Sequence, residues 1–207
     1  SGLCRKDCEG VMNDATAGDV LPDAQSSTGK VFRTHLDGVM TEAIGKPSSF
    51  LEKFWSRYPQ GTPVVNGNVF EVLISVLLYR QGLKPLYQQA TIAFVPNVIF
   101  DLVLYTKEYG PVVLSIKTSL RERYKQVDLD GTVLRNVHRR ARTYLITANK
   151  NEAASVNRKI TGFDVQGIEK VVYAFGKDMD ELVVFLRQLE LVQPGTQDIL
   201  TAGRTLI

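Results

Sequence analysis

Three ionisable residues interrupt stretches of the sequence that are otherwise apolar. Glu71 lies in an eleven-residue run with nine apolar members, Asp101 lies within Ile99–Leu104, and Lys117 ends the apolar segment that begins at Val112. An unpaired charge in a protein core costs several kcal/mol. We therefore expect these three side chains to be paired, bound to a metal or placed at an edge that water reaches.

Strand pairing decides whether Asp101 and Lys117 meet. If a turn at Thr106–Pro111 closes a hairpin, one register places Asp101 opposite Ile116 and another places it opposite Lys117, with Cβ atoms roughly 5 Å apart. In the second register Ser115 lies on the same face, because side chains alternate along a strand, whereas a one-residue slip moves Lys117 to the other face. Polar groups gathered there, near the Glu71 segment, suit a divalent cation bound by oxygen atoms, with an ammonium beside it.

Each of these residues also has a purely structural interpretation. Asn68 and Glu71 are spaced like the N-cap and N3 residues of a capping box. Asp101 and Lys117 fit a simple cross-strand ion pair, and Ser115 fits a filler of space. Their occurrence on consecutive elements favours the functional interpretation.

Positive charge is concentrated in one segment. The chain has a net charge of +3, yet the segment from Arg121 to Arg142 holds seven bases against three acids. Such a segment suits a polyanion, with phosphate contacts that make the affinity depend on salt. The alternative is a solvated basic helix face.

The elements that must position these residues follow from apolar spacing and turn signals. We expect two helices between Val31 and Tyr58, broken at Gly45–Pro47, and an irregular tail from Gln193. Asp128–Gly131 is a point of interruption in the basic helix. The other expected elements are, in order, helix Val69–Arg80, strands Gln88–Val95, Ile99–Thr106 and Val112–Thr118, helix Arg121–Arg142, strand Tyr144–Thr147, helix Asn151–Ile160, strand Val171–Phe175 and helix Met179–Leu191. This order predicts an α/β fold with a central mixed β-sheet flanked by helices and preceded by an N-terminal helical extension.

The first 30 residues are poor in aromatic residues, so we expect a loose arm or short helices with a linker at Asp23–Gly29. Cys4 and Cys8 lack enough neighbouring ligands for a structural zinc site and are expected to be free thiols in a reducing cytosol. No apolar run reaches 18 residues, so no membrane contact is expected. We divide the chain at residues 1–65 (arm and helical extension), 66–192 (core) and 193–207 (tail), within one domain.

The order of a helix with Glu, a strand with Asp and a strand ending in Ser-x-Lys resembles the core of the PD-(D/E)xK nucleases. Asp101 is followed by thirteen residues and then by Ser115-Ile-Lys117. The stretch from Ser115 to Gln126, with the basic helix after it, resembles type II restriction endonucleases. The resemblance covers residues 66–148, about 40% of the chain. The sequence departs from the family motif at Phe100, where proline is usual, and at Ser115, where a second acid is usual.

The resemblance implies a Mg²⁺-dependent endonuclease with a restriction-endonuclease-like αβββαβ core. Asp101 would bind Mg²⁺ directly, with the Ile116 carbonyl as a further ligand. Lys117 would orient or deprotonate the attacking water, and Glu71 would hold the metal or one of its waters. Because Ser115 replaces the second acid, another carboxylate is needed: Glu71 is favoured, and the alternatives are Glu122, Asp128 and Asp130.

The implied partner is double-stranded DNA, cut to leave 5′-phosphate ends by a homodimer or tetramer in the cytoplasm of a prokaryotic cell. The expected DNA contacts are Arg121, Arg123, Lys125, Gln126, Arg135, His138, Arg139 and Arg140. Three alternatives stay open: a repair, recombination or structure-selective nuclease of the same fold, a catalytically inactive nucleic-acid-binding protein, and an unrelated α/β domain with structural ion pairs.

Overall fold

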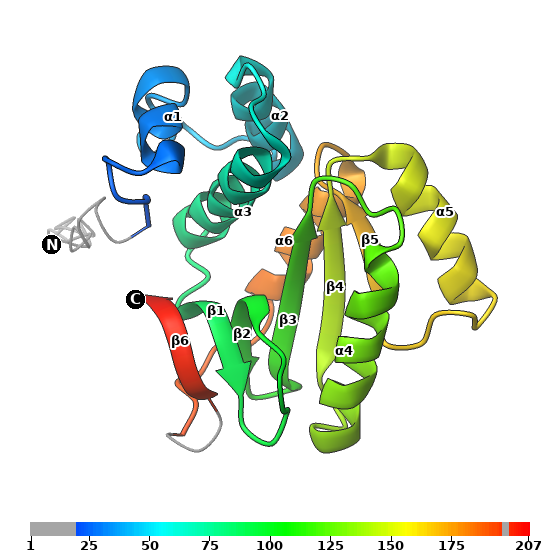
Figure 1. The fold of residues 1–207 in the computed structure, drawn as a ribbon. Helices are drawn as coiled ribbons and strands as arrows, with labels where there is room; N and C mark the ends of the chain where they lie inside the picture. The colour runs from blue at the N-terminus through cyan, green and yellow to red at the C-terminus, as the bar shows by residue number, and fades with distance from the viewer. Residues whose placement is uncertain (1–19, 196–198) are drawn as a thin grey trace, which may run out of the picture.

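The computed structural model describes residues 20–195 and 199–207. Its centre is a six-stranded mixed sheet in the order β5-β4-β3-β2-β1-β6, in which β3, β4 and β5 are parallel and the other pairings are antiparallel (Figure 1). The strands are β1 (Leu86–Ile92), β2 (Phe100–Thr106), β3 (Gly110–Lys117), β4 (Arg142–Thr147), β5 (Lys170–Tyr173) and β6 (Ile199–Leu206). The α/β class and the mixed sheet agree with the prediction.

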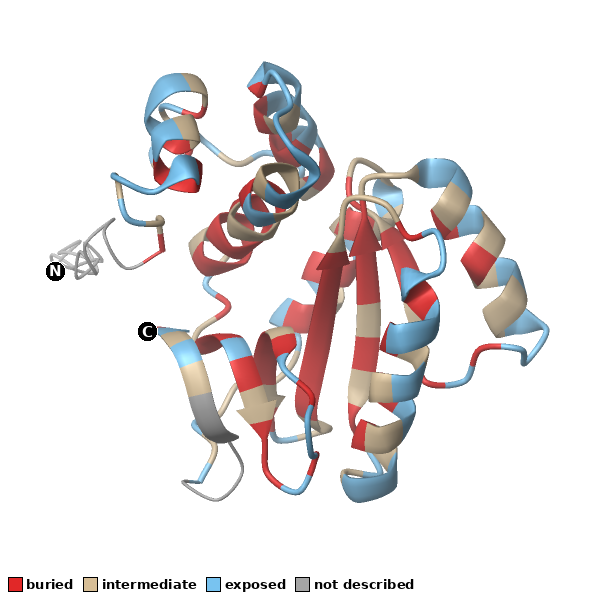
Figure 2. Ribbon diagram, in the orientation of Figure 1, coloured by how far each residue is buried: buried red, intermediate tan, exposed pale blue. Residues whose placement is uncertain are grey.

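Helices cover both faces of this sheet. They are α1 (Ser27–His35), α2 (Pro47–Arg57), α3 (Pro63–Arg80), α4 (Arg123–Val137), α5 (Lys150–Thr161) and α6 (Lys177–Arg187). On one face, α1, α2, α3 and α6 share a core with even-numbered residues of β2 and β3, such as Leu102 and Leu114. On the other face, α4 packs on Val103 and Val113, and α4 and α5 together pack on Leu145. The central strands β3 and β4 are therefore mostly buried (Figure 2).

Helix α3 begins earlier than its apolar run predicts. Thr62 is the N-cap, its hydroxyl accepts a hydrogen bond from the Val65 amide, and Pro63 stands in the first turn, where a missing N–H costs nothing. Glu71 therefore lies in the middle of an 18-residue helix. The capping-box interpretation of Asn68 and Glu71 is wrong.

The β2–β3 hairpin adopts neither of the two expected registers, and it is shifted by two residues from the one that set Asp101 opposite Lys117. Leu102 pairs with Leu114 and Thr106 with Gly110, so continuing the ladder sets Asp101 opposite Ser115 rather than Lys117. A shift of two preserves which face each side chain occupies, because the side-chain period of a strand is two. Asp101, Ser115 and Lys117 therefore still share a face.

Two local predictions about the end of the chain and about α4 are wrong. The segment after Gln193 contains strand β6, which pairs with β1 from Leu86↔Leu206 to Ile92↔Ile199. Helix α4 runs through Asp128 without a break, because the Asp128 carboxylate points outward and accepts hydrogen bonds from the amides of Gln166 (2.9 Å) and Gly167 (2.5 Å).

At the N-terminal side, α1 begins at Ser27, inside the segment Asp23–Gly29 that was predicted to be a linker, and Ser26 caps it through the Gly29 amide. Cys4, Cys8 and most of the predicted arm lie outside the described residues. Among the helices described, none combines the length and apolarity needed to cross a membrane.

The contact between α4 and the loop before β5 leads to a stability prediction. A Cβ atom on Gly167 would lie 1.9 Å from the Asp128 carbonyl oxygen, whereas one on Gly67 in α3 would meet nothing within 4 Å. We expect Gly167→Ala to lower the free energy of unfolding by about 2–3 kcal/mol through overpacking. Gly67→Ala, the control, should raise it by about 0.5–1 kcal/mol because glycine weakens a helix interior. Urea denaturation measures both, and equal stability of the two variants would contradict the close packing.

Candidate active site

The carboxylate of Asp101 sits where the regular β2–β3 ladder stops. Its Oδ2 atom accepts hydrogen bonds from the backbone N–H of Ile116 (2.7 Å) and from Nζ of Lys117 (2.7 Å). The side chains of Asp101 and Lys117 are 13% and 29% exposed, so solvent reaches the pair. Oδ1 of Asp101 has no hydrogen-bond partner among the described residues, which leaves it available to a ligand. Asp101 and Lys117 therefore form the predicted pair, with Ile116 contributing its amide.

Glu71 approaches this pair from α3. Its Oε1 accepts a hydrogen bond from the side-chain amide of Gln89 on β1 (2.8 Å). Burial raises the pKa of Glu71 above its ordinary value, and the charge of Asp101 adds to the rise, while the Gln89 hydrogen bond and Lys117 oppose it. Because Gln89 lies across from Asp101 in the β1–β2 register, this hydrogen bond ties Glu71 to the strand next to Asp101.

Gln89 is a support for Glu71 that the sequence did not reveal. Its backbone has φ of 49°, a left-handed conformation that is uncommon in a strand. Gly203 of β6 lies against it, and a Cβ on Gly203 would approach the Gln89 Cβ to 3.2 Å. Because glycine has no side chain, position 203 leaves room for Gln89 to turn toward Glu71.

A further candidate carboxylate is carried by α4. Asp130 accepts a hydrogen bond from the side-chain amide of Gln126 (2.6 Å). Its pKa is raised mainly by burial, with Asp101 raising it and Lys117 lowering it, so Asp130 lies in the field of the same ion pair. The other two candidates for the second acid are engaged elsewhere: Asp128 holds the loop before β5, and Glu122 is exposed and pairs with Lys125.

Ser115 is the fourth of the predicted catalytic residues. It is 9% exposed and lies on the face of β3 that carries Lys117, opposite Asp101 when the ladder is continued. Its hydroxyl offers a weak oxygen donor where the family motif has a carboxylate. The candidate replacements for that carboxylate are carried by α3 and α4, which pack on opposite faces of the sheet.

The candidate site offers oxygen donors, which are the ligands that Mg²⁺ takes. Within the described residues, no group of three or more His, Cys, Asp or Glu side chains forms a ready cage for a metal ion. Mg²⁺ does not need one, because it keeps several waters and binds through one or two carboxylates and substrate phosphates. Asp101 with Glu71 or Asp130 provides such carboxylates. The role of the Ile116 carbonyl remains a prediction.

The first group of predicted DNA contacts lies beside the site, after β3. Arg121, Arg123 and Lys125 are exposed, while Gln126 holds Asp130. The turn that carries Arg121 is fixed by Glu152 of α5, whose carboxylate accepts hydrogen bonds from the amides of Leu120 (2.6 Å) and Arg121 (3.4 Å) and from the hydroxyl of Ser119 (3.1 Å). The sequence gave no signal for this role of Glu152, which lies some thirty residues away.

The second group of predicted contacts lies at the opposite end of α4. Arg139 and Arg140 are exposed and precede Arg142, which pairs with Val112 near the start of β3, whereas Lys117 ends that strand. Arg135 lies between the two groups and binds Glu169 (2.7 Å) and the Gln166 carbonyl (2.9 Å). The basic segment is therefore divided into two separate surfaces and is not one continuous patch.

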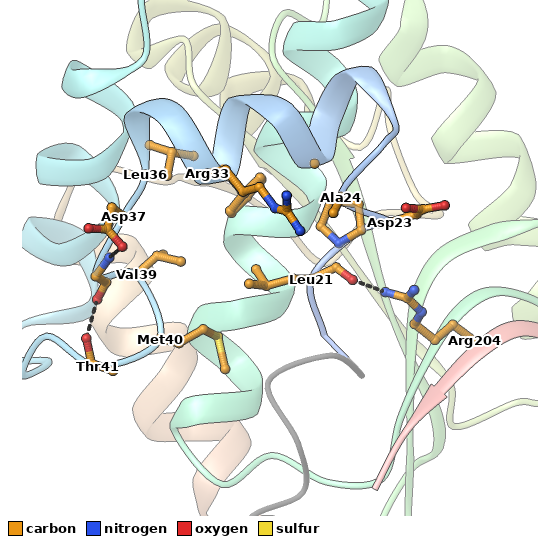
Figure 3. Close-up of a pocket in the computed structure, with 14 residues that line it drawn as sticks. Leu21, Asp23, Ala24, Arg33, Leu36, Asp37, Val39, Met40, Thr41 and Arg204 are labelled. Carbon is orange, nitrogen blue, oxygen red and sulfur yellow. Dashed lines mark hydrogen bonds between the residues drawn. The ribbon is translucent and has the colours of Figure 1, made fainter.

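A cavity of about 570 Å³ lies elsewhere, between α1, residues 38–41 and β6. Its lining is largely apolar and includes Leu21, Leu36, Val39 and Met40, with Arg33 and Arg204 among the polar residues (Figure 3). None of the predicted site residues lines it, so it is separate from the chemistry described here.

Comparison with known proteins adds nothing to this geometry: no protein-family model, no curated protein and no solved structure matches the chain.

The raised pKa of Glu71 predicts how it affects stability. At pH values just above 4.5, the ordinary pKa of a glutamate, Glu71 has lost its proton in the unfolded chain but still holds it in the folded protein. The free energy of unfolding therefore falls as the pH rises through this interval. We expect Glu71→Gln, measured in EDTA, to gain stability relative to the wild type as the pH rises from below 4.5 toward 7. Glu52→Gln, at an exposed position of α2, is the control. A constant difference between Glu71→Gln and the wild type across this range would contradict the burial of a charged carboxylate.

Proposed function

We propose that the protein is a Mg²⁺-dependent endonuclease that hydrolyses phosphodiester bonds of double-stranded DNA, with sequence-specific cleavage of the type II restriction kind. The observation that carries the proposal is the Asp101–Lys117 pair at a partly exposed strand end, with Glu71 hydrogen-bonded to Gln89 on the neighbouring strand β1. An ammonium beside several carboxylates, on a partly exposed strand end, suits attack of water on a phosphodiester. The αβββαβ order of α3, β1, β2, β3, α4 and β4 supports the resemblance to the PD-(D/E)xK core.

The roles of the strand residues follow from their contacts. Mg²⁺, when bound, would supply Lewis-acid charge next to the scissile phosphate. Asp101 would hold it through the Oδ1 atom, while Oδ2 stays fixed by Ile116 and Lys117. Lys117, held 2.7 Å from Asp101, would orient the attacking water and neutralise charge that develops on the phosphoryl oxygens.

The acids from the helices would complete the site. Glu71 and Asp130 have raised pKa values chiefly because they are buried. A cation placed between them and Asp101 would favour their charged forms, because an opposite charge stabilises a carboxylate. Together they would supply the negative charge that Ser115 does not.

The partner assignment rests on the exposed bases beside Lys117. Arg121, Arg123 and Lys125 would contact phosphates or base edges next to the cut. Cleavage of both strands of a palindrome needs two sites related by two-fold symmetry, which a homodimer or a tetramer would provide. The products would carry 5′-phosphate ends, as in the nucleases that the sequence resembles.

A second candidate function follows from Ser115. With a serine at the usual position of the second acid, the same fold would serve a nucleic-acid-binding protein that has lost cleavage. Binding of DNA without any cutting in Mg²⁺ or Mn²⁺ separates this candidate from the nuclease.

The central prediction concerns the ion pair. Asp101→Ala and Lys117→Ala should each lower Mg²⁺-dependent cleavage of plasmid DNA by at least about 100-fold while the circular dichroism spectrum stays unchanged, because each removes charge at the reacting phosphate. Lys107→Ala removes the exposed partner of Glu190 and should cut like the wild type. EDTA should stop cleavage. Full activity of either site variant would show that the site is misassigned.

A second prediction separates the candidate acids. Glu71→Gln and Asp130→Asn should each raise the Mg²⁺ concentration needed for half-maximal cleavage, by about tenfold, because each removes one carboxylate ligand or its charge. Glu122→Gln, which changes an exposed glutamate paired with Lys125, should leave the Mg²⁺ requirement unchanged. An effect confined to Glu122→Gln would contradict the arrangement.

A further inference from the structure

A pocket with a distinct chemistry lies at the end of the sheet remote from Lys117. It has a volume of about 230 Å³ and lies between the β2–β3 turn and the C-terminal end of α4. Its lining joins two aromatic rings to three basic side chains, namely Tyr105, Tyr109, His138, Arg139 and Arg140, with Gly110 and Pro111. We call Phe94, Tyr105, Tyr109, His138, Arg139 and Arg140 the distal patch.

The charge of the distal patch is not compensated locally. Arg139 and Arg140 are exposed, and neither has an ion-pair partner in the part of the chain that the structure describes. The neighbouring arginines differ, because Arg135 and Arg142 share the carboxylate of Glu169 at 2.7 and 2.6 Å. The two exposed guanidinium groups are therefore available to an external anion.

An exposed aromatic ring lies on the loop that contacts His138. Phe94 is 80% exposed and has φ of 63°, in the loop between β1 and β2. The carbonyl of the preceding residue, Ala93, lies 3.2 Å from the Nε2 atom of His138, which fixes this part of the loop to the patch. A bulky residue held in the left-handed region with its ring in solvent is uncommon, and it leaves apolar surface free for a ligand.

The distance between the distal patch and the catalytic site can be expressed as a length of DNA duplex. Lys117 lies six positions after Pro111 along β3. Six positions of extended strand span about 20 Å. About 20 Å corresponds to roughly six base pairs of DNA.

From this geometry we propose that the distal patch is a second DNA contact surface, which binds the phosphate backbone of the duplex about six base pairs from the scissile bond. This inference rests on the proposed function, because it assumes that a duplex occupies the Lys117 end. Arg139 and Arg140 bind phosphates, and the ring of Phe94 packs on a sugar or base edge. Paired basic and aromatic groups are the usual surface for nucleic acid.

Binding of a fluorescein-labelled 30-base-pair duplex in EDTA, followed by anisotropy between 50 and 200 mM KCl, tests the proposal without cleavage. Loss of two phosphate contacts in Arg139→Ala/Arg140→Ala should weaken binding about tenfold and reduce the slope of log affinity against log salt by about 2. The control, Arg158→Ala/Arg187→Ala, removes two exposed arginines on α5 and α6 and should bind like the wild type.

The aromatic contact has a closely matched control. Phe94→Ala should weaken binding about fivefold, which is the lower end of the worth of a base–aromatic contact. Phe163, which follows α5, has the same φ of 63° and the same exposure of 80%. Phe163→Ala therefore controls for the loss of an exposed ring from a residue with left-handed backbone. Thermal unfolding should be unchanged in the arginine variants.

The outcomes separate this inference from the proposed function. If the wild type binds and cuts DNA while the Arg139/Arg140 variant keeps wild-type affinity and salt slope, the distal patch is wrong and the nuclease assignment stands. An equal loss in the α5–α6 control variant would also overturn the patch, because the effect would then be one of net charge. Failure of the wild type to bind duplex at 50 mM KCl would overturn both.

Discussion

The site depends on one backbone N–H group whose hydrogen bond is accepted by a side chain and not by the neighbouring strand. At the point where the β2–β3 ladder stops, the carboxylate of Asp101 takes the N–H of Ile116 that the next ladder position would otherwise use, and it binds Lys117 with the same oxygen. An unpaired N–H in a buried strand is costly, so the carboxylate is fixed by the need to satisfy the sheet. The same hydrogen bonds leave its other oxygen exposed to a ligand. Structural stability and chemical function therefore require the same orientation of one side chain.

Around this anchor the structure gathers acids from two helices that approach from different sides. Glu71 comes from α3 and Asp130 from α4, and each accepts a hydrogen bond from a glutamine amide, Gln89 or Gln126. Both carboxylates are held in partly buried positions where their pKa values rise. Burial of these carboxylates disfavours their charged forms, at a cost in stability, and a cation bound beside them would favour those forms. Such local destabilisation is typical of functional sites.

The parts of the molecule that local pattern controls were predictable. The apolar runs of β2 and β3 indicated the hairpin but left its register open. Asp101, Ser115 and Lys117 share one face because the observed register differs by two residues from the one that set Asp101 opposite Lys117. Contacts between distant segments were not predictable. Glu152 binds the Arg121 turn and Asp128 binds the Gly167 loop through hydrogen bonds that span 30 or more residues of sequence. The basic segment is divided because its two groups of arginines lie at opposite ends of α4. Single-sequence periodicity carries no information on such pairings.

Strand β6 has a consequence for the timing of folding. It is synthesised after the other five strands of the described sheet, yet its partner is β1, more than a hundred residues earlier in the chain. Gly203 of β6 lies against Gln89, which binds Glu71. The surroundings of Glu71 are therefore complete only after β6 has left the ribosome and paired with β1. A nascent chain that still lacks residues 199–206 would hold an unfinished pocket, and long-range pairing of this kind is slow to form.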